Sequence, residues 1–549
     1  MLLLAGSVLA LSSPAQAADQ SGAALHALVK ARLAEEAGQP VAALSALTAL
    51  ASAAPRLPGV RGQMLEQAIA AGDLPAARSA ALQLWQAGDR RFDAQLVLLV
   101  DAMHRSDWKA AREYIGGRAD KTGGDVMSRL IQPAINAWID LGLREKAPER
   151  YLLIANARGR PEPAMALEAA IVQLVTKRPA EAVALTDDII LTDRTSQLTA
   201  LRLAATLDKA GEADAAKRLR GRIALASGER EDPSLLLPDQ AVVTPREGAA
   251  HWLGMLADGF ARIPNGGPKI PMLFAHAAYW LNDRDWTARS ALVEALDRDG
   301  QAPAAAALLA SKGAALPPVL QMRRAELMAD AGDMTGAAKL AEAAVAGDAP
   351  ARSLLVRFAD IARRSDDKAA AARAYAQIEA TLGEGDGEQA LRGTLLIARA
   401  ELLLQSGDWD AAQPLIEKAV ALRPNDASVL NFAGYSAIER RKDVKQSLAR
   451  IETAWNAEPQ SPSITDSLGW AYFLTGRADE AVPLLEKAQS GEPDNAVIVE
   501  HLGDAYWHVG RKFQARYTWR AATLLAEEDM AARLEAKLRD GLTPETMAP

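Results

Sequence analysis

A repeat of 34 residues near the C-terminal end constrains the fold of this chain more than any other feature. The segment from Pro462 to Asn495 and the segment from Ala496 to about Asp529 carry matching residues at matching offsets. The shared positions are Leu468/Leu502, Gly469/Gly503, Tyr472/Tyr506, Gly476/Gly510, Ala481/Ala515 and Ala488/Ala522. Self-similarity at a fixed period of this length indicates a repeat protein, in which each unit stacks on its neighbours.

A turn signal extends the same periodicity towards the N-terminus. A Gly, or a small or polar substitute, is followed five residues later by Ala, and successive copies are 34, 34, 36, 35 and 34 residues apart. The pairs are Gly38/Ala43, Gly72/Ala77, Ser106/Ala111, Gly142/Ala147, Lys177/Ala182 and Gly211/Ala216. The signal resumes at Gly300/Ala305, Gly332/Ala337, Ser365/Ala370, Gly407/Ala412, Arg441/Ser447, Gly476/Ala481 and Gly510/Ala515. Spacings this regular indicate one long array.

The chemistry of this turn predicts a pair of helices in each repeat. Glycine readily adopts the left-handed conformation that ends a first helix. An Asp or Pro then starts the second helix, as in Gly72-Asp73-Leu74-Pro75. The small Ala lets the second helix lie close against the first. The sequence therefore predicts an all-α protein built from helix-turn-helix hairpins.

Composition limits the kinds of function that the chain can have. The 549 residues include no cysteine, which excludes disulfides, thiolate metal sites and cysteine nucleophiles. The formal net charge of −8 gives no support for a general nucleic-acid or anionic-membrane surface. We therefore predict no nucleic-acid partner.

The N-terminus predicts export. An apolar run from Leu2 to Leu11 is followed by Ala15-Gln16-Ala17, a small-x-small cleavage pattern, so we predict a signal peptide over residues 1–17. The run is too short to span a bilayer, and no cysteine follows it for a lipid anchor. The alternative is that this stretch is the first helix of the array. Export predicts a soluble periplasmic protein with no integral membrane span.

Two breaks divide the predicted array into sections. Pro233, Pro238 and Pro245 disfavour helix, and a run of Gly alternating with acidic residues begins at Gly383. Between them, Gly248 to Arg262 and Ile270 to Leu281 are predicted to form another helical pair. The predicted organisation is N-terminal repeats over 18–227, a linker over 228–247, middle repeats over 248–383, a Gly-rich break over 384–391, C-terminal repeats with a capping helix over 392–540, and a tail over 541–549.

From Arg392 onward the chain resembles the tetratricopeptide repeat (TPR) family. The two copies at Pro462 and Ala496 fit best, and two looser copies precede them. The usual aromatic residue near the start of the first helix is replaced by Asn431, Thr465 and Val499. The resemblance implies a right-handed α-solenoid of about thirteen to fourteen TPR-like repeats.

A more specific resemblance involves Asp466-Ser467-Leu468-Gly469-Trp470-Ala471-Tyr472 and His501-Leu502-Gly503-Asp504-Ala505-Tyr506-Trp507. These segments are similar to exported proteobacterial TPR adaptors that partner a periplasmic carboxyl-terminal processing protease. The adaptor family is lipidated, whereas this chain lacks the required cysteine. The resemblance implies a non-enzymatic scaffold whose partners are proteins, such as a periplasmic protease or envelope assembly machinery.

The TPR resemblance also implies which residues line the concave face. They are Asn431, Tyr435, Asp466, Trp470, Phe473, Glu500, Asp504, Trp507 and His508. Aromatic side chains are good binding anchors, and carboxylates beside them favour a polypeptide that bears Lys or Arg. The alternative is that Trp470 and Trp507 belong to the core between repeats, where aromatic residues at helical spacing are common.

Catalytic motifs are missing from the sequence. It contains no His-Glu-x-x-His, no Gly-x-Ser-x-Gly and no phosphate-binding Gly-rich loop. Glu500, Asp504 and His508 are too far apart along one helix for all three to hold one metal ion, so a solvated face is the better interpretation. We predict no catalytic residue, cofactor or metal.

The alternative to a protein-binding scaffold is a polysaccharide- or peptidoglycan-associated factor that supports glycan export or a cell-wall enzyme.

Overall fold

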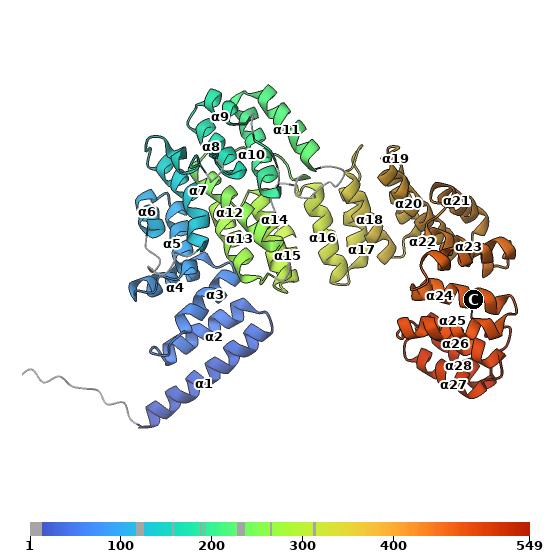
Figure 1. Ribbon diagram of the computed structural model, residues 1–549. Coiled ribbons are helices and arrows are strands. Elements are labelled where there is room, and N and C mark those ends of the chain that lie inside the picture. The colour runs from blue at the N-terminus through green and yellow to red at the C-terminus, as the bar shows by residue number, and fades with distance from the viewer. Residues whose placement is uncertain are drawn as a thin grey trace, which may run out of the picture. The chain divides into compact units, whose positions relative to one another are not determined.

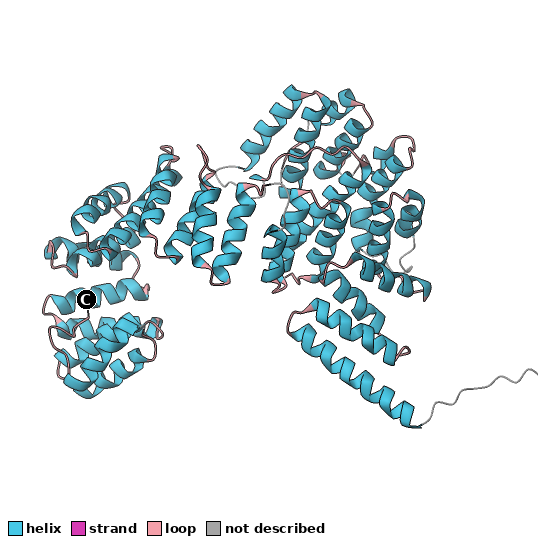
Figure 2. Cartoon of the chain, turned by 180° about the vertical axis from the view of Figure 1, so that it is seen from behind, coloured by secondary structure: helices cyan, strands magenta, loops and turns pink. Residues whose placement is uncertain are grey.

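The computed structural model describes residues 14–116, 126–155, 159–186, 189–191, 193–227, 236–263, 266–310, 315–526 and 528–548. Within these ranges the chain forms α helices, 3-10 segments, turns and loops, and it contains no strand (Figure 2). The predicted all-α hairpin solenoid is confirmed. The apolar run of the predicted signal peptide lies outside the described residues.

The chain divides into two compact units, Met1–Ser365 (unit 1) and Asp366–Pro549 (unit 2). The first part of unit 1 contains α1 (Pro14–Glu36), α2 (Pro40–Ala53), α3 (Val60–Ala70), α4 (Leu74–Gln86), α5 (Phe92–His104), α6 (Trp108–Gly116), α7 (Val126–Gly142), η1 (Pro148–Tyr151), α8 (Pro163–Val175), α9 (Pro179–Thr186), α10 (Arg194–Ala210) and α11 (Ala213–Ser227). Its second part contains α12 (Pro245–Ala261), α13 (Lys269–Leu281), α14 (Trp286–Arg298), α15 (Ala302–Ala310), α16 (Pro318–Asp330), α17 (Met334–Ala344) and α18 (Arg352–Arg364).

The predicted left-handed turns occur throughout both units. The turn residue has a positive φ at Gly38, Gly72, Ser106, Lys177, Gly211, Gly300, Gly332, Gly407, Arg441, Gly476 and Gly510. At the two remaining positions the left-handed residue is shifted, from Gly142 to Arg144 and from Ser365 to Asp366. Repeat spacing therefore located the turns even where no glycine is present.

The hairpin of α12 and α13 departs from simple stacking. Helix α13 packs against α3 and α5, while α12 packs against α7 and α10 (Figure 1). These four partners are first helices of the N-terminal repeats, so the hairpin covers the face that those helices share. Helix α12 begins at Pro245, inside the stretch predicted as a linker, because Thr244 and Glu247 form a capping box.

A buried polar cluster lies where α12 meets the N-terminal repeats. Trp138 on α7 donates from Nε1 to Oε1 of Glu168 on α8 at 2.8 Å. His251 on α12 places Nε2 3.8 Å from the other oxygen of Glu168. The three side chains are fully or almost fully buried. A Cβ at Gly248 would meet the Trp138 ring at 2.2 Å, so this glycine permits the close approach of α12 to α7.

Unit 2 continues as stacked hairpins. Its helices are α19 (Lys368–Ala380), α20 (Asp386–Gln405), α21 (Trp409–Leu422), α22 (Ala427–Ile438), α23 (Val444–Ala457), α24 (Pro462–Leu474), α25 (Ala478–Gly491), α26 (Ala496–His508), α27 (Lys512–Thr523) and α28 (Glu528–Asp540). The first helices α20, α22, α24 and α26 contact one another in sequence. Helix α20 begins at Asp386, so most of the stretch predicted as a Gly-rich break is helical. Only the residues up to Gly385 lie outside it.

Candidate functional site

The nine residues predicted to line a concave groove lie on three neighbouring first helices of unit 2. Asn431 and Tyr435 are on α22, Asp466, Trp470 and Phe473 are on α24, and Glu500, Asp504, Trp507 and His508 are on α26. Five of the nine are buried in the structure, and these are Asp466, Trp470, Phe473, Glu500 and Asp504. Asn431, Tyr435 and Trp507 are half-buried, and His508 is exposed.

Trp470 belongs to the contact between successive repeats. Its ring is 0% exposed and stacks on His501 of α26 with ring centroids 4.0 Å apart. The Phe473 ring also stacks on the Trp470 ring, with the two ring centroids 4.7 Å apart. Asp466 hydrogen-bonds Nδ1 of His501 at 3.0 Å. A fully buried ring offers no surface to a partner, so Trp470 takes the core position that the sequence left open as the alternative.

The carboxylates of α26 are paired with cations from the chain's own capping helix. Lys537 of α28 is 0% exposed, and its Nζ lies 2.7 Å from Glu500 and 2.7 Å from Asp504. Arg533, one turn earlier, donates to both oxygens of Glu500 at 2.9 and 2.7 Å. The sequence predicted that these acids favour Lys or Arg of a partner polypeptide, whereas in the structure Glu500 and Asp504 are paired with Arg533 and Lys537 of the same chain.

The C-terminal residues complete the surroundings of Asp504. Trp519 donates from Nε1 to Asp504 at 2.8 Å, and the backbone N–H of Ala548 donates to it at 2.9 Å. Burial raises the pKa of Asp504, although the charge and hydrogen bond of Lys537 oppose this effect. The predicted tail is therefore packed against the last repeat, and Ala548 is 2% exposed.

The remaining open part of the predicted groove is a rim of Asn431, Tyr435, Trp507 and His508. Burial, the largest influence, raises the pKa of the Tyr435 hydroxyl, with the neighbouring carboxylates adding to it. Nowhere among the described residues do three or more His, Asp or Glu side chains gather so that they could hold a metal ion. Partner binding at this face stays a prediction.

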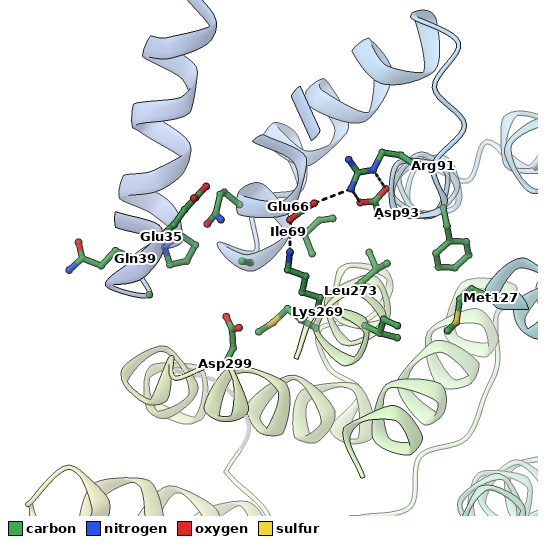
Figure 3. Close-up of a pocket in the computed structure, with 17 residues that line it drawn as sticks. Glu35, Gln39, Glu66, Ile69, Arg91, Asp93, Met127, Lys269, Leu273 and Asp299 are labelled. Carbon is green, nitrogen blue, oxygen red and sulfur yellow. Dashed lines mark hydrogen bonds and ion pairs between the residues drawn. The ribbon is translucent and has the colours of Figure 1, made fainter. Parts of the chain in front are cut away.

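An open cleft of about 490 Å³ lies in unit 1, where the α12–α13 hairpin meets the N-terminal repeats (Figure 3). Its walls are the end of α1 with the turn to α2, helix α3, the start of α5, Met127 at the start of α7, the start of α13 and the residue after α14. An ion network crosses one wall. Lys269 contacts Glu66 at 2.8 Å, Glu66 contacts Arg91 at 3.1 Å, and Arg91 contacts Asp93 at 2.7 Å.

The cleft combines an acidic rim with an apolar floor. Four acidic side chains line it, Glu35, Glu66, Asp93 and Asp299, against two basic ones, Arg91 and Lys269. Burial works to raise the pKa of Glu66, but hydrogen bonds from Lys269 and Arg91 outweigh it, so this pKa is lowered and the carboxylate is charged. The floor is apolar, with Ile69, Phe92, Met272 and Leu273.

A second, more apolar cavity of about 750 Å³ adjoins the cleft. Gln39, Pro40 and Ala70 line both spaces. The second cavity continues along α2, α13, α14 and α15 and includes Trp280 and the buried His276. The sequence did not predict either space, because Lys269 and Glu66 are 203 residues apart and repeat spacing describes only neighbouring hairpins.

Comparisons with known proteins give only distant similarities. No family model matches the chain, and no curated protein matches it. Among solved structures, the chain is similar to a tetratricopeptide repeat protein from Parabacteroides merdae, at 14% identity over 45% of this chain and 94% of that one, with a TM-score of 0.37. It is also similar to the APC/C hetero-tetramer Cut9-Hcn1, at 14% identity over 97% and 99%, with a TM-score of 0.35.

A third similarity is to MamA from Desulfovibrio magneticus RS-1, at 20% identity over 33% of this chain and 96% of that one, with a TM-score of 0.27. These matches are to helical repeats and name no partner for this chain. No helix in the described ranges has the length and apolar character that crossing a membrane would need.

Proposed function

We propose that this protein is a non-enzymatic scaffold of the bacterial periplasm that binds other polypeptides, with the cleft of unit 1 as its main site. The observation that carries this proposal is the cleft itself. It is open, its walls come from separate parts of the chain, and the Lys269–Glu66–Arg91–Asp93 network ties α13 to α3 and α5. A preformed site loses less entropy when it binds.

The chemistry of the cleft defines the class of partner. The apolar floor favours an apolar side chain, and the excess of acidic groups favours a neighbouring Lys or Arg. A volume of about 490 Å³ accommodates a few side chains and not a folded domain. We therefore propose that the cleft binds an exposed or extended segment of an envelope protein, with apolar and basic residues side by side.

Reversing the charge of the cleft rim is expected to weaken this binding about tenfold. The variant Glu35→Lys/Asp299→Lys changes two rim carboxylates. It removes the contact of Glu35 with Arg32 at 2.8 Å and leaves the Lys269–Glu66–Arg91–Asp93 network unchanged. Three short fluorescent peptides serve as probes. The first contains Leu beside Lys, the second contains Leu beside Glu, and the third contains Ser beside Lys. Fluorescence anisotropy should show the tightest binding for the peptide with Leu and Lys. Equal binding of all three peptides would contradict the proposal.

Matched controls separate the cleft from general charge. The variant Glu36→Lys/Asp283→Lys makes the same change in net charge at exposed residues outside the cleft lining, and it should bind like the wild type. Ile270→Ser removes an exposed apolar side chain from the lining, whereas Ile263→Ser removes one elsewhere. Only the first should weaken binding. A response to glycan fragments in place of peptides would favour the polysaccharide-associated alternative.

Export is tested separately from binding. If residues 1–17 are a signal peptide, the mature protein in a periplasmic extract begins at Ala18. Mass spectrometry of the N-terminal peptide measures this directly. Recovery of the chain from the cytosolic fraction with Met1 to Ala17 intact would contradict the periplasmic assignment and would leave the cleft proposal untouched.

A further inference from the structure

Helix α27 presents an unusual stripe of large apolar side chains to solvent. Phe513 is 86% exposed, Tyr517 is 74% exposed and Leu524, directly after the helix, is 85% exposed. Spacings of four and seven residues place the three on one face, because an α helix completes a turn every 3.6 residues. Trp519 and Ala522, on the opposite face, are fully buried against the neighbouring helices.

The same helix is strongly basic in a chain of net charge −8. Between Lys512 and Thr523 it carries Lys512, Arg516 and Arg520 and no acidic residue. Helical spacing puts these three cations along one edge of the apolar stripe, while Gln514 and Ala521 lie along the other edge. The stripe therefore has one basic border and one uncharged border.

No ion pair joins these three cations to any acidic residue whose side chain the structure describes, a set that leaves out Glu527, Glu528 and Asp529. Arg516 donates from Nε to the backbone carbonyl of Leu538 at 3.4 Å. Lys512 and Arg516 lie over the Trp507 ring at 5.0 Å, and all three side chains are exposed. The preceding Arg511 differs, because it contacts Glu486 at 3.0 Å. Exposed aromatic residues beside Arg side chains have the composition of an interaction hot spot.

We infer that the exposed face of α27 is a docking surface for an acidic amphipathic helix of another protein. The partner's apolar residues contact Phe513, Tyr517 and Leu524, and its carboxylates follow the basic border. The stripe spans three turns of helix, about 16 Å, so a partner helix of similar length suffices. Because the border is basic on one side only, it also fixes the direction in which the partner lies.

Charge favours a polypeptide over a membrane as the occupant. The net charge of −8 opposes approach to an extended anionic bilayer. A single acidic helix that lies along α27 meets Lys512, Arg516 and Arg520, and screening at physiological salt confines the interaction to about 8 Å. This surface is separate from the unit 1 cleft and requires a partner of opposite charge, so the two proposals succeed or fail independently.

Designed peptides test this surface on the full chain. The probe is a labelled amphipathic helix with Leu at the stripe spacing and Glu along one edge. Two comparison peptides replace Glu by Lys or Leu by Ser. Fluorescence anisotropy should show binding of the Leu and Glu peptide, at least about tenfold weaker in Phe513→Ser/Tyr517→Ser and in Lys512→Glu/Arg520→Glu. Thermal melts verify that these surface variants remain folded.

Two control variants change exposed residues away from α27. Leu225→Ser/Val356→Ser removes exposed apolar side chains elsewhere, and Lys442→Glu/Lys445→Glu reverses exposed charges elsewhere. Both should bind the peptide like the wild type, as should the cleft variant Glu35→Lys/Asp299→Lys. No binding of the acidic peptide up to about 1 mM, or equal binding of all three peptides, overturns the inference. So does α27-dependent binding to phosphatidylglycerol vesicles, or α27-dependent self-association by sedimentation, without peptide binding.

Discussion

Replacing Lys537 with alanine is expected to destabilise unit 2 by about 3–5 kcal/mol at neutral pH. The ammonium group is completely buried and lies 2.7 Å from carboxylates on both Glu500 and Asp504. Alanine leaves Asp504 buried without its cation, and the carboxyl must then protonate or draw in water. Hydrogen exchange of α26 and α28 measures the effect locally, and urea titration measures it for the whole chain.

Two further variants define the cause of this effect. Lys445→Ala removes an exposed lysine from α23 and should change the free energy of unfolding by less than about 0.5 kcal/mol. The combination Glu500→Gln/Asp504→Asn/Lys537→Met neutralises these three residues together and should recover part of the lost stability, because neutral groups avoid the desolvation cost. Recovery is incomplete because an amide accepts from only one of Trp519 and Ala548, and Arg533 loses its carboxylate partner. A loss below about 1 kcal/mol in Lys537→Ala would contradict a buried, charge-paired role.

Local periodicity made much of the fold predictable. The left-handed turn appears at Ser106, Lys177 and Arg441, where no glycine is present, because the repeat period fixes the turn independently of its residue type. The α12–α13 pair was expected from Gly248 to Arg262 and from Ile270 to Leu281, close to the observed helices. Such features depend on neighbouring residues and neighbouring hairpins, which a single sequence displays.

Features that depend on how distant helices meet were not predictable. An aromatic residue at helical spacing fits a groove and a core equally well, so only the packing of α26 shows that Trp470 is covered. Arg533 and Lys537 are four residues apart, as are Glu500 and Asp504. This matching spacing was a usable signal for a pairing between α28 and α26, but the angle of α28 decides whether the pairs meet. The unit 1 cleft forms because α13 packs against α3 and α5, which lie far earlier in the chain.

The second large effect is expected from Glu168→Gln, which should stabilise unit 1 at alkaline pH by about 3 kcal/mol or more. Glu168 is fully buried, and burial raises its pKa to about 8 from an ordinary value of 4.5, against the smaller effects of its hydrogen bond from Trp138 and the charge of Arg202. The folded form therefore holds a proton at neutral pH that the unfolded form releases. Glutamine is neutral at every pH and keeps an oxygen for the Trp138 N–H.

The sign of the pH dependence follows from these two pKa values. Because the folded pKa is raised, the contribution of Glu168 to stability is fully present below about pH 4.5 and is lost as the pH rises to about 8. His276 acts in the opposite direction, since burial lowers its pKa to about 4 from 6.5. The loss of stability caused by burying neutral His276 begins as the pH falls below 6.5 and is complete below about pH 4. Burial also lowers the pKa of His251, with a smaller contribution from Arg202.

Subtracting wild type from variant cancels the contribution of His276. His251 lies 3.8 Å from Glu168 and does not cancel in this way, but above about pH 6.5 it is neutral in the folded and the unfolded form, so the difference there reports Glu168. The difference in free energy of unfolding should be smallest below about pH 4.5, rise through neutral pH and level off above about pH 8. Urea titrations at several pH values, together with hydrogen exchange in α7, α8 and α12, measure it. Glu145→Gln makes the same substitution at an exposed residue and should show no such rise. A pH-independent difference at Glu168 would show that its carboxyl ionises alike in both states, so that the buried cluster of α7, α8 and α12 contains a charged carboxylate and not a neutral carboxyl.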